Sequence, residues 1–243
     1  MLERVNKKKL EKVSTEIKMQ QSIVLFWDTC SLLDIIRLPF RTDSDRYLDS
    51  YQRICSDIFE GKVISVASAL TIAELSYNFP TVEAEYDRYI RKLQNELKLH
   101  DDYLIKSDCI PQRILDFRLD EKGLKEYLLS LFNKIIANTT FISEKKTFNK
   151  FAHFRVAYHM APAGRKGEYK DCYIWSTCLE LAKELRQSNS IMYFFTKNKD
   201  DFSYNGQLYP LIQTDCTNSS VQIKYEVGDL YGELLAASFP FKS

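Results

Sequence analysis

The sequence predicts a doubly wound α/β fold, in which a mainly parallel sheet is flanked by helices and carries a helical insertion. Three observations lead to this class. Short runs that are apolar at every position, such as Ser22 to Trp27, indicate strands buried on both faces. These runs end in polar residues and are followed by helical patterns, which is the order of a βα unit. Between Pro80 and Lys150, strand signals are weak and helical patterns dominate.

The first predicted elements are a helix, a strand and a second helix. Apolar residues recur at roughly helical spacing between Met1 and Gln21, which predicts a Lys-rich amphipathic helix ahead of the sheet. The strand over Ser22 to Trp27 ends at Asp28. A new helical pattern follows Asp28, so this aspartate is expected at the carboxyl end of the first strand.

The next unit repeats this order and leads into the insertion. Lys62 to Val66 is predicted as a strand, and Ser68 to Tyr77 as a helix that contains Glu74. Helical stretches are expected over Val82 to Leu99 and Leu124 to Ala137. Each half of the sheet pattern is too short to fold alone. We therefore expect one domain over residues 22–243, with a helical insertion over residues 80–150.

The last part of the chain returns to the sheet. Asp171 to Arg186 is predicted as a helix with Asp171 in its first turn, where a carboxylate meets the positive end of the helix dipole. Ile191 to Phe195 is a further apolar strand, and the polar residues Asn198 and Asp201 follow it. A short strand is expected over Leu208 to Ile212.

Composition narrows the class of protein. The 243 residues carry a net charge of +1, so any attraction to nucleic acid must come from a local patch. The six cysteines are scattered without a C-x-x-C pair, which is typical of reduced thiols. No signal peptide and no apolar run of membrane-spanning length is visible. We expect a cytoplasmic protein without a membrane segment.

Acidic and amide side chains from four separate segments are expected at one edge of the sheet. Asp28 ends the first predicted strand, Glu74 lies on the helix after the second, and Asp171 begins the helix before the third. Asn198 and Asp201 follow that third strand. Ligands of open α/β sheets bind outside the carboxyl ends of the strands. Clustered carboxylates repel unless a cation neutralises them, and hard oxygen ligands suit Mg²⁺ or Mn²⁺. The sequence therefore predicts a site for one of these ions.

Four segments carry a family resemblance. In order, they are IVLFWDTCSLLD, ALTIAEL, GRKGEYKDCYIW and FFTKNKDDF. They resemble the four motifs of PIN-domain nucleases, and the third is similar to a PIN-like subfamily with a helical insertion. The resemblance assigns Asp28, Glu74 and Asp171 to the three acidic positions. It places Asn198 at the fourth position, with Asp201 following, and leaves open whether Asp201 supplies the missing charge.

The resemblance implies an activity and partners. PIN-domain proteins of this kind are metal-dependent endonucleases that hydrolyse phosphodiester bonds with metal-activated water, and RNA is a more common substrate than DNA. Many small PIN-domain proteins are toxins restrained by an inhibitory protein partner, so a growth-inhibiting or defence role is an implied hypothesis.

Several neighbouring residues are candidates for auxiliary roles. Glu168 lies about one helical turn before Asp171, and its carboxylate is a candidate further ligand. Thr196 follows the strand that precedes Asn198, and its hydroxyl is a candidate partner for an acid or a phosphate. Arg165, Lys166 and Lys170 flank the acids, and such basic groups suit a phosphate backbone.

Other interpretations remain open from the sequence. Asp28 is also a reasonable helix N-cap, and Thr71 with Glu74 has the spacing of a capping box. Asn198 in place of an acid is compatible with a PIN-like binding or scaffold module that has lost activity. A haloacid-dehalogenase-type phosphatase also begins with a buried strand that ends in Asp. That class needs a second Asp two residues later, where this chain has Cys30.

Overall fold

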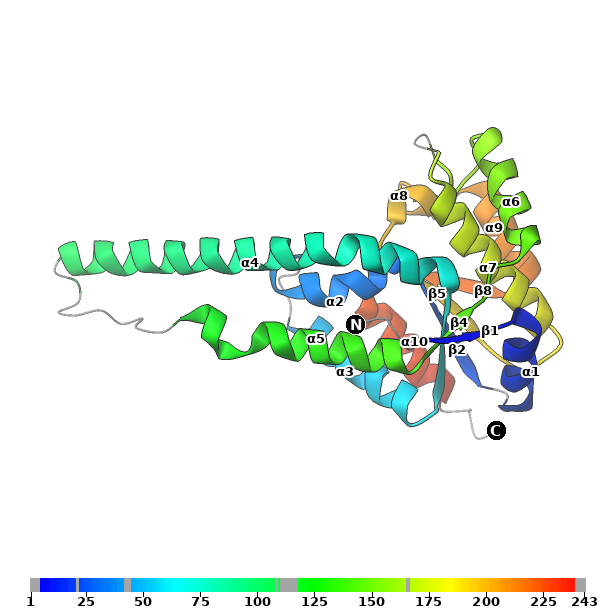
Figure 1. Ribbon diagram of the computed structural model, residues 1–243, viewed down its shortest axis with the longest axis horizontal. Helices are drawn as coiled ribbons and strands as arrows, with labels where there is room; N and C mark the ends of the chain where they lie inside the picture. The colour runs from blue at the N-terminus through cyan, green and yellow to red at the C-terminus, as the bar shows by residue number, and fades with distance from the viewer. Residues whose placement is uncertain are drawn as a thin grey trace.

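The computed structural model describes residues 5–20, 22–41, 45–107, 109, 118–164 and 167–238. Its centre is a sheet of six parallel strands in the order β1-β4-β3-β2-β5-β8 (Figure 1). The strands are β1 (Asn6–Lys8), β2 (Ile23–Trp27), β3 (Val63–Ser68), β4 (Thr139–Ile142), β5 (Met192–Phe195) and β8 (Val221–Lys224). A separate antiparallel hairpin is formed by β6 (Ser203–Tyr204) and β7 (Gln207–Leu208). The predicted α/β class with a parallel sheet is confirmed.

Helices cover the sheet and extend beyond it. They are α1 (Leu10–Gln20), α2 (Thr29–Arg41), α3 (Arg46–Phe59), α4 (Ala69–Lys106), the 3₁₀ helix η1 (Leu119–Lys122), α5 (Leu124–Ala137), α6 (Lys146–Ala157), α7 (Tyr169–Leu185), α8 (Lys199–Phe202), α9 (Pro210–Ser219) and α10 (Val227–Ser238). Among the described residues, none of these helices is both long enough and apolar enough to cross a lipid bilayer.

Each face of the sheet packs against its own layer of helices. Successive side chains of a strand point to opposite faces. Leu25 and Trp27 of β2 belong to a core formed with α2, α3, α4, α5 and α10. Val24 and Phe26 belong to a second core formed with α1, α7 and α9. Because both faces are covered, every position of β2 after its first residue is buried, which explains the continuous apolar run in the sequence.

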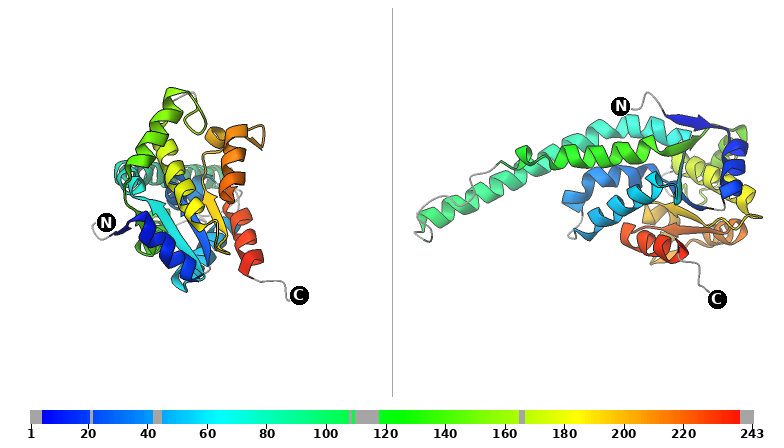
Figure 2. Two further views of the ribbon diagram at one scale, coloured as in Figure 1. Left: turned by 90° about the vertical axis from the view of Figure 1, so that its right-hand side faces the viewer. Right: turned by 90° about the horizontal axis from the view of Figure 1, so that it is seen from below.

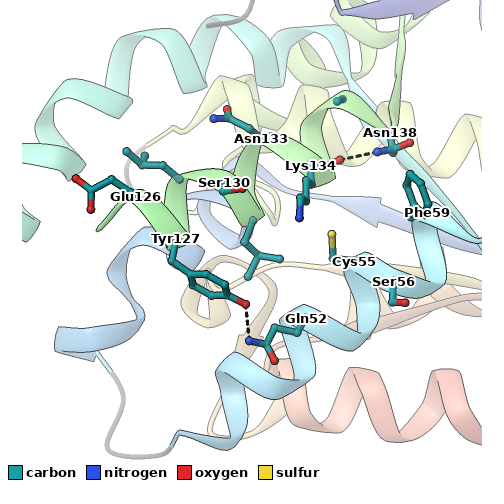
Figure 3. A pocket seen from close by; sticks show the side chains of 13 residues that line it. Gln52, Cys55, Ser56, Phe59, Glu126, Tyr127, Ser130, Asn133, Lys134 and Asn138 are labelled. Carbon is teal, nitrogen blue, oxygen red and sulfur yellow. Dashed lines mark hydrogen bonds between the residues drawn. The ribbon is translucent and has the colours of Figure 1, made fainter. Parts of the chain in front are cut away.

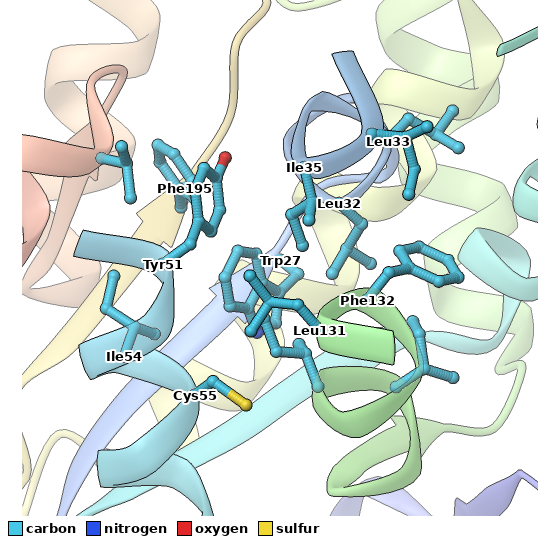
Figure 4. Close-up of a cluster of buried hydrophobic side chains, with 14 of the residues drawn as sticks. Trp27, Leu32, Leu33, Ile35, Tyr51, Ile54, Cys55, Leu131, Phe132 and Phe195 are labelled. Atoms are coloured by element: carbon cyan, nitrogen blue, oxygen red, sulfur yellow. The ribbon is translucent and has the colours of Figure 1, made fainter. Parts of the chain in front are cut away.

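Aromatic packing holds the carboxyl ends of the neighbouring strands β2 and β5 together. Trp27 ends β2 and Phe195 ends β5, and both side chains are fully buried. Their rings meet edge to face with centroids 5.6 Å apart, beside Tyr51 of α3 (Figure 4). The indole Nε1 of Trp27 donates a hydrogen bond of 2.8 Å to the hydroxyl of Ser65 on β3. The carboxyl ends of β2 and β5 are therefore tied to one core and to the middle of β3.

The helical insertion forms an arm that projects from the sheet. α4 has 38 residues, which corresponds to a length of about 57 Å. α5 returns beside it (Figures 1 and 2), and the rings of Phe79 and Phe132 pack against each other between the two helices at a tilt of 39°, with centroids 5.4 Å apart. The sequence predicted that the helix beginning at Ser68 would end before Pro80. Instead α4 continues through the exposed Pro80, because core packing of the neighbouring Phe79 and Val82 outweighs the local cost of a proline inside a helix.

Three strands of the main sheet differ from the sequence-based expectation. β1 lies within the segment expected to be a helix, and helix α1 begins only at Leu10. β4 lies within the range expected for the insertion. The strand expected over residues 208–212 is wrong, because β7 ends at Leu208 and α9 begins at Pro210, and the sixth strand is β8. β1 and β8 are edge strands with polar residues, so they lack the continuous apolar run that marks a buried strand.

The aromatic contact between β2 and β5 leads to a stability prediction. We expect Phe195→Ala to lower the free energy of unfolding by about 3–5 kcal/mol, because it opens a cavity in a fully packed core. Urea unfolding followed by fluorescence measures this change. Phe59→Ala is the matched control, since Phe59 is exposed on α3 and its loss should change stability by about 0.5 kcal/mol or less. Equal losses in the two variants would contradict this packing.

Candidate active site

Asp28 lies at the carboxyl end of β2, beside the end of β5. Its backbone N–H donates to the carbonyl of Phe195 at 3.0 Å. Its carboxylate accepts hydrogen bonds from the Thr29 N–H at 2.7 Å, the Cys30 thiol at 2.9 Å and the Thr196 hydroxyl at 2.6 Å. The side chain is only 4 % exposed. Three donors from two elements thus hold the Asp28 carboxylate in one orientation.

Glu74 lies in the second turn of α4, close to the first turn of α2. The N-cap of α4 is Ser68, whose hydroxyl accepts a hydrogen bond from the Leu70 N–H at 3.3 Å. Thr71 is therefore inside the helix, and the capping-box interpretation of Glu74 is wrong. Instead, the Oε2 atom of Glu74 accepts a hydrogen bond of 2.5 Å from the Thr29 hydroxyl. Thr29 thus links the segment that carries Asp28 to the helix that carries Glu74.

Asp171 and Asp201 are brought near each other by packing between α7 and α8. Asp171 is the third residue of α7, and Trp175 lies on the same helix face one turn later. The Trp175 ring meets the buried ring of Phe202 edge to face, with centroids 5.5 Å apart. Phe202 follows Asp201 directly, so this contact anchors Asp201 on the Asp171 side of the sheet. The Asn198 amide donates a hydrogen bond to the Asp201 carboxylate.

Neighbouring acids raise the pKa values of Asp171 and Glu74. The pKa of Asp171 is raised to about 9 by burial first, and then by the negative charges of Asp28, Asp201 and Glu74 and, least, Glu168. Burial is also the main cause that raises the pKa of Asp28 and that of Glu74. Asp171 is therefore protonated near neutral pH unless a cation compensates the neighbouring charges.

The acids described here are not arranged as a complete set of ligands for one metal ion. In the described part of the chain, no three His, Cys, Asp or Glu side chains are grouped closely enough to hold one ion. The expectation that three carboxylates would lie within reach of a single ion is therefore not met. Three of the four carboxylates instead accept hydrogen bonds from neighbouring side chains: Asp28 from Thr196, Glu74 from Thr29, and Asp201 from Asn198. The carboxylates nevertheless offer hard oxygen ligands, which suit Mg²⁺ or Mn²⁺.

The auxiliary candidates lie in different places. Thr196 is fully buried against Asp28. Glu168 is exposed at the N-cap position of α7, and its charge is the weakest of those that act on Asp171. The Nζ atom of Lys170 lies 3.5 Å from Oε1 of Glu74. Arg165 and Lys166 fall outside the described residues.

Sequence reasoning missed three residues that shape this region. Thr29 and Cys30 follow Asp28 directly, and their adjacency to a strand-end acid is the signal that could have identified them. Gly164 has a φ of +57°, and a Cβ atom on it would lie 3.0 Å from Oδ1 of Asp201. Glycine at this position therefore allows the loop before α7 to pass close to Asp201.

An open groove of about 1130 Å³ lies elsewhere, between α3 and α5 (Figure 3). Its lining includes Gln52, Cys55 and Phe59 from α3 and Tyr127 and Lys134 from α5. The Gln52 amide donates to the Tyr127 hydroxyl across it. None of the acids discussed above lines this groove, so the acidic edge of the sheet is a separate feature of the surface.

Comparison with known proteins assigns the chain to a family. The sequence profile described as "PIN domain" matches residues 25–202, well over half of the chain. The matched range includes Asp28, Glu74, Asp171 and the segment from Asn198 to Asp201. No curated protein and no solved structure matches the chain.

The raised pKa of Asp171 predicts how stability depends on pH in the absence of divalent ions. In the unfolded chain an aspartate ionises near pH 3.9, whereas Asp171 in the folded protein ionises near pH 9. Between these values the folded state binds the extra proton, so this group lowers the free energy of unfolding as pH rises. We expect Asp171→Asn to gain stability over the wild type progressively from about pH 5 to about pH 9.

Thermal unfolding in EDTA across this pH range measures the difference. Asp171 has no hydrogen bond to another described residue, so the substitution removes charge without removing a bonded partner. Parallel pH profiles for the wild type and Asp171→Asn would show that Asp171 does not carry the pKa shift.

Proposed function

The chain belongs to the PIN-domain family, and on that premise we propose that it is a metal-dependent endonuclease that prefers RNA. The observation that carries the proposal is the mutual effect of four acids from separate elements. Asp28, Glu74 and Asp201 all raise the pKa of Asp171. Such crowding destabilises a protein unless a cation is bound, and it is typical of functional sites.

We assign Asp28, Glu74 and Asp171 to holding Mg²⁺ or Mn²⁺, with Asp201 and Asn198 completing the site. When bound, such an ion supplies a water that is deprotonated near neutral pH and positive charge against the leaving oxygen. The hydroxyls of Thr196 and Thr29 orient the carboxylates of Asp28 and Glu74. These two threonines act as positioning residues.

Basic side chains provide the contact with the substrate backbone. Lys170 lies beside Glu74, and we assign it, with Arg165 and Lys166, to binding phosphates near the cleaved bond. Hydrolysis adds water across one phosphorus–oxygen bond and leaves a phosphate monoester and a hydroxyl group. The family premise extends the proposal to a growth-inhibiting or defence role, in which an inhibitory protein partner restrains cleavage.

Substitution of the acids tests the proposal. We expect wild-type protein to cleave single-stranded RNA with Mn²⁺ or Mg²⁺ and to be inactive in EDTA. Asp28→Asn and Asp171→Asn should each lower the cleavage rate by at least about 100-fold, because an anionic ligand and general-base capacity are lost. Gel analysis of labelled RNA and DNA oligonucleotides measures the rates and the preference between the two substrates.

Asp34→Asn is the matched control for this experiment. Asp34 is a buried aspartate of α2 that faces Lys197, and it is not among the charges that raise the pKa of Asp171. Its substitution should leave the cleavage rate within about threefold. Full activity of Asp28→Asn and Asp171→Asn would exclude this site. A wild type that neither cleaves RNA nor gains stability from Mn²⁺ would instead favour the binding-module alternative.

The fourth position of the site gives a separate prediction. Asn198→Asp replaces the amide that donates to Asp201 with a second carboxylate. We expect a lower melting temperature in EDTA, because the two anions repel, and a larger increase on adding Mn²⁺ than in the wild type. Thermal unfolding with and without Mn²⁺ measures both effects. An unchanged response to Mn²⁺ would mean that residue 198 does not face the ion.

A further inference from the structure

An exposed aromatic side chain lies one helical turn beyond Glu74. Tyr77 follows Glu74 by three residues on α4, so the two side chains share a helix face. The Tyr77 side chain is 79 % exposed, whereas the Glu74 side chain is only 12 % exposed. A single exposed aromatic residue is common on protein surfaces and carries no conclusion alone. Tyr77 is of interest because it lies beside the acidic edge of the sheet.

Lys170 connects this ring with the acidic site. Its Nζ atom lies 5.8 Å from the centre of the Tyr77 ring and 3.5 Å from Oε1 of Glu74. The distance to the ring is within the range of a cation–π contact. Lys170 comes from the first turn of α7, next to Asp171. A cation and an exposed π-face from two different helices are thus held together directly beside two of the acids.

These two groups match the two parts of a nucleotide. A flat aromatic ring accepts a nucleobase by stacking, and an ammonium group binds a phosphate. We propose that Tyr77 and Lys170 form a subsite for one unpaired nucleotide adjacent to the phosphate that is cleaved, so that single-stranded nucleic acid is the substrate. The inference rests on the nuclease function proposed above. Neither the sequence motifs nor the family match assigns a role to Tyr77.

The geometry selects single strands for a physical reason. In a duplex, both faces of each base are covered by neighbouring base pairs, so a side chain cannot stack on a base without unstacking the helix. An unpaired base offers its face freely. Every base has such a face, so the Tyr77 subsite tolerates sequence variation while it rejects duplexes.

Binding measurements in an inactive background test the subsite. Asp171→Asn protein in Mg²⁺ is titrated into short RNA and DNA single strands that contain one 2-aminopurine, and into the corresponding duplexes. We expect Tyr77→Ala to weaken single-strand binding about 5- to 100-fold, as for loss of one base–aromatic stack. It should also abolish the fluorescence quenching that stacking causes. Tyr77→Phe keeps the ring and should retain both binding and quenching.

Two further variants complete the design. Tyr103→Ala is the matched control, because Tyr103 lies on the same helix, is similarly exposed and is far along the arm from Glu74. We expect it to bind single strands like the parent protein. Lys170→Gln should reduce the slope of log affinity against log salt concentration by about 0.7, which corresponds to one lost phosphate contact on a single strand.

The outcomes separate this inference from the proposed function. Unchanged single-strand binding and quenching in Tyr77→Ala, with cleavage by the wild type, would overturn the subsite and leave the nuclease intact. Weakened binding in Tyr77→Ala without any cleavage by the wild type would support the subsite and overturn the nuclease. A third outcome would also overturn the subsite for an unpaired base. In that outcome the parent protein binds duplexes and single strands with equal affinity, and Tyr77→Ala lowers both affinities equally.

Discussion

The pairing of β2 with β5 is the constraint on which the rest of the site depends. In this register Trp27 lies opposite Phe195, so the residues that follow, Asp28 and Thr196, leave the sheet side by side. The Ser31 hydroxyl reinforces the pairing, since it lies 2.7 Å from the Asp28 carbonyl and 2.8 Å from the Phe195 carbonyl. With the strand ends fixed, the first turn of α2 delivers donors to the Asp28 carboxylate, and Thr29 extends the network to Glu74.

A concentration of negative charge at this edge opposes folding, and the two cores on either side of the sheet offset that cost. Burial increases the free-energy cost of these charges, because desolvation favours the neutral form of each acid. The hydroxyl and thiol donors around Asp28 act in the other direction and favour its ionised form. Asp171 has no such donors among the described residues, and its pKa is raised to about 9.

The helix α4 contributes residues to the candidate site and also forms one of the two helices of the arm. Its first three turns carry Glu74 and Tyr77 at the edge of the sheet, while its remainder projects with α5 away from the acids. Packing of the Phe79 ring against the Phe132 ring and an ion pair between Asp87 and Lys125 join the two helices. The inner part of the arm is thus fixed to the main core, which keeps the first turns of α4 in place.

The sequence by itself determined the fold class and the position of Asp28 directly after a buried strand, because both depend on local signals. A short uninterrupted apolar run followed by a helical pattern favours a strand covered on both faces, and a polar residue directly after such a strand lies at the carboxyl edge of the sheet. Tertiary structure decided the rest. The Thr29–Glu74 bond joins residues 45 apart, and the contact of Trp175 with Phe202 places Asp201. Edge strands such as β8 lack an apolar run. An edge strand pairs with one neighbour only and is partly exposed, so it can contain polar residues. The raised pKa of Asp171 likewise exists only when distant segments meet, because charge repulsion and desolvation act through space and not along the chain.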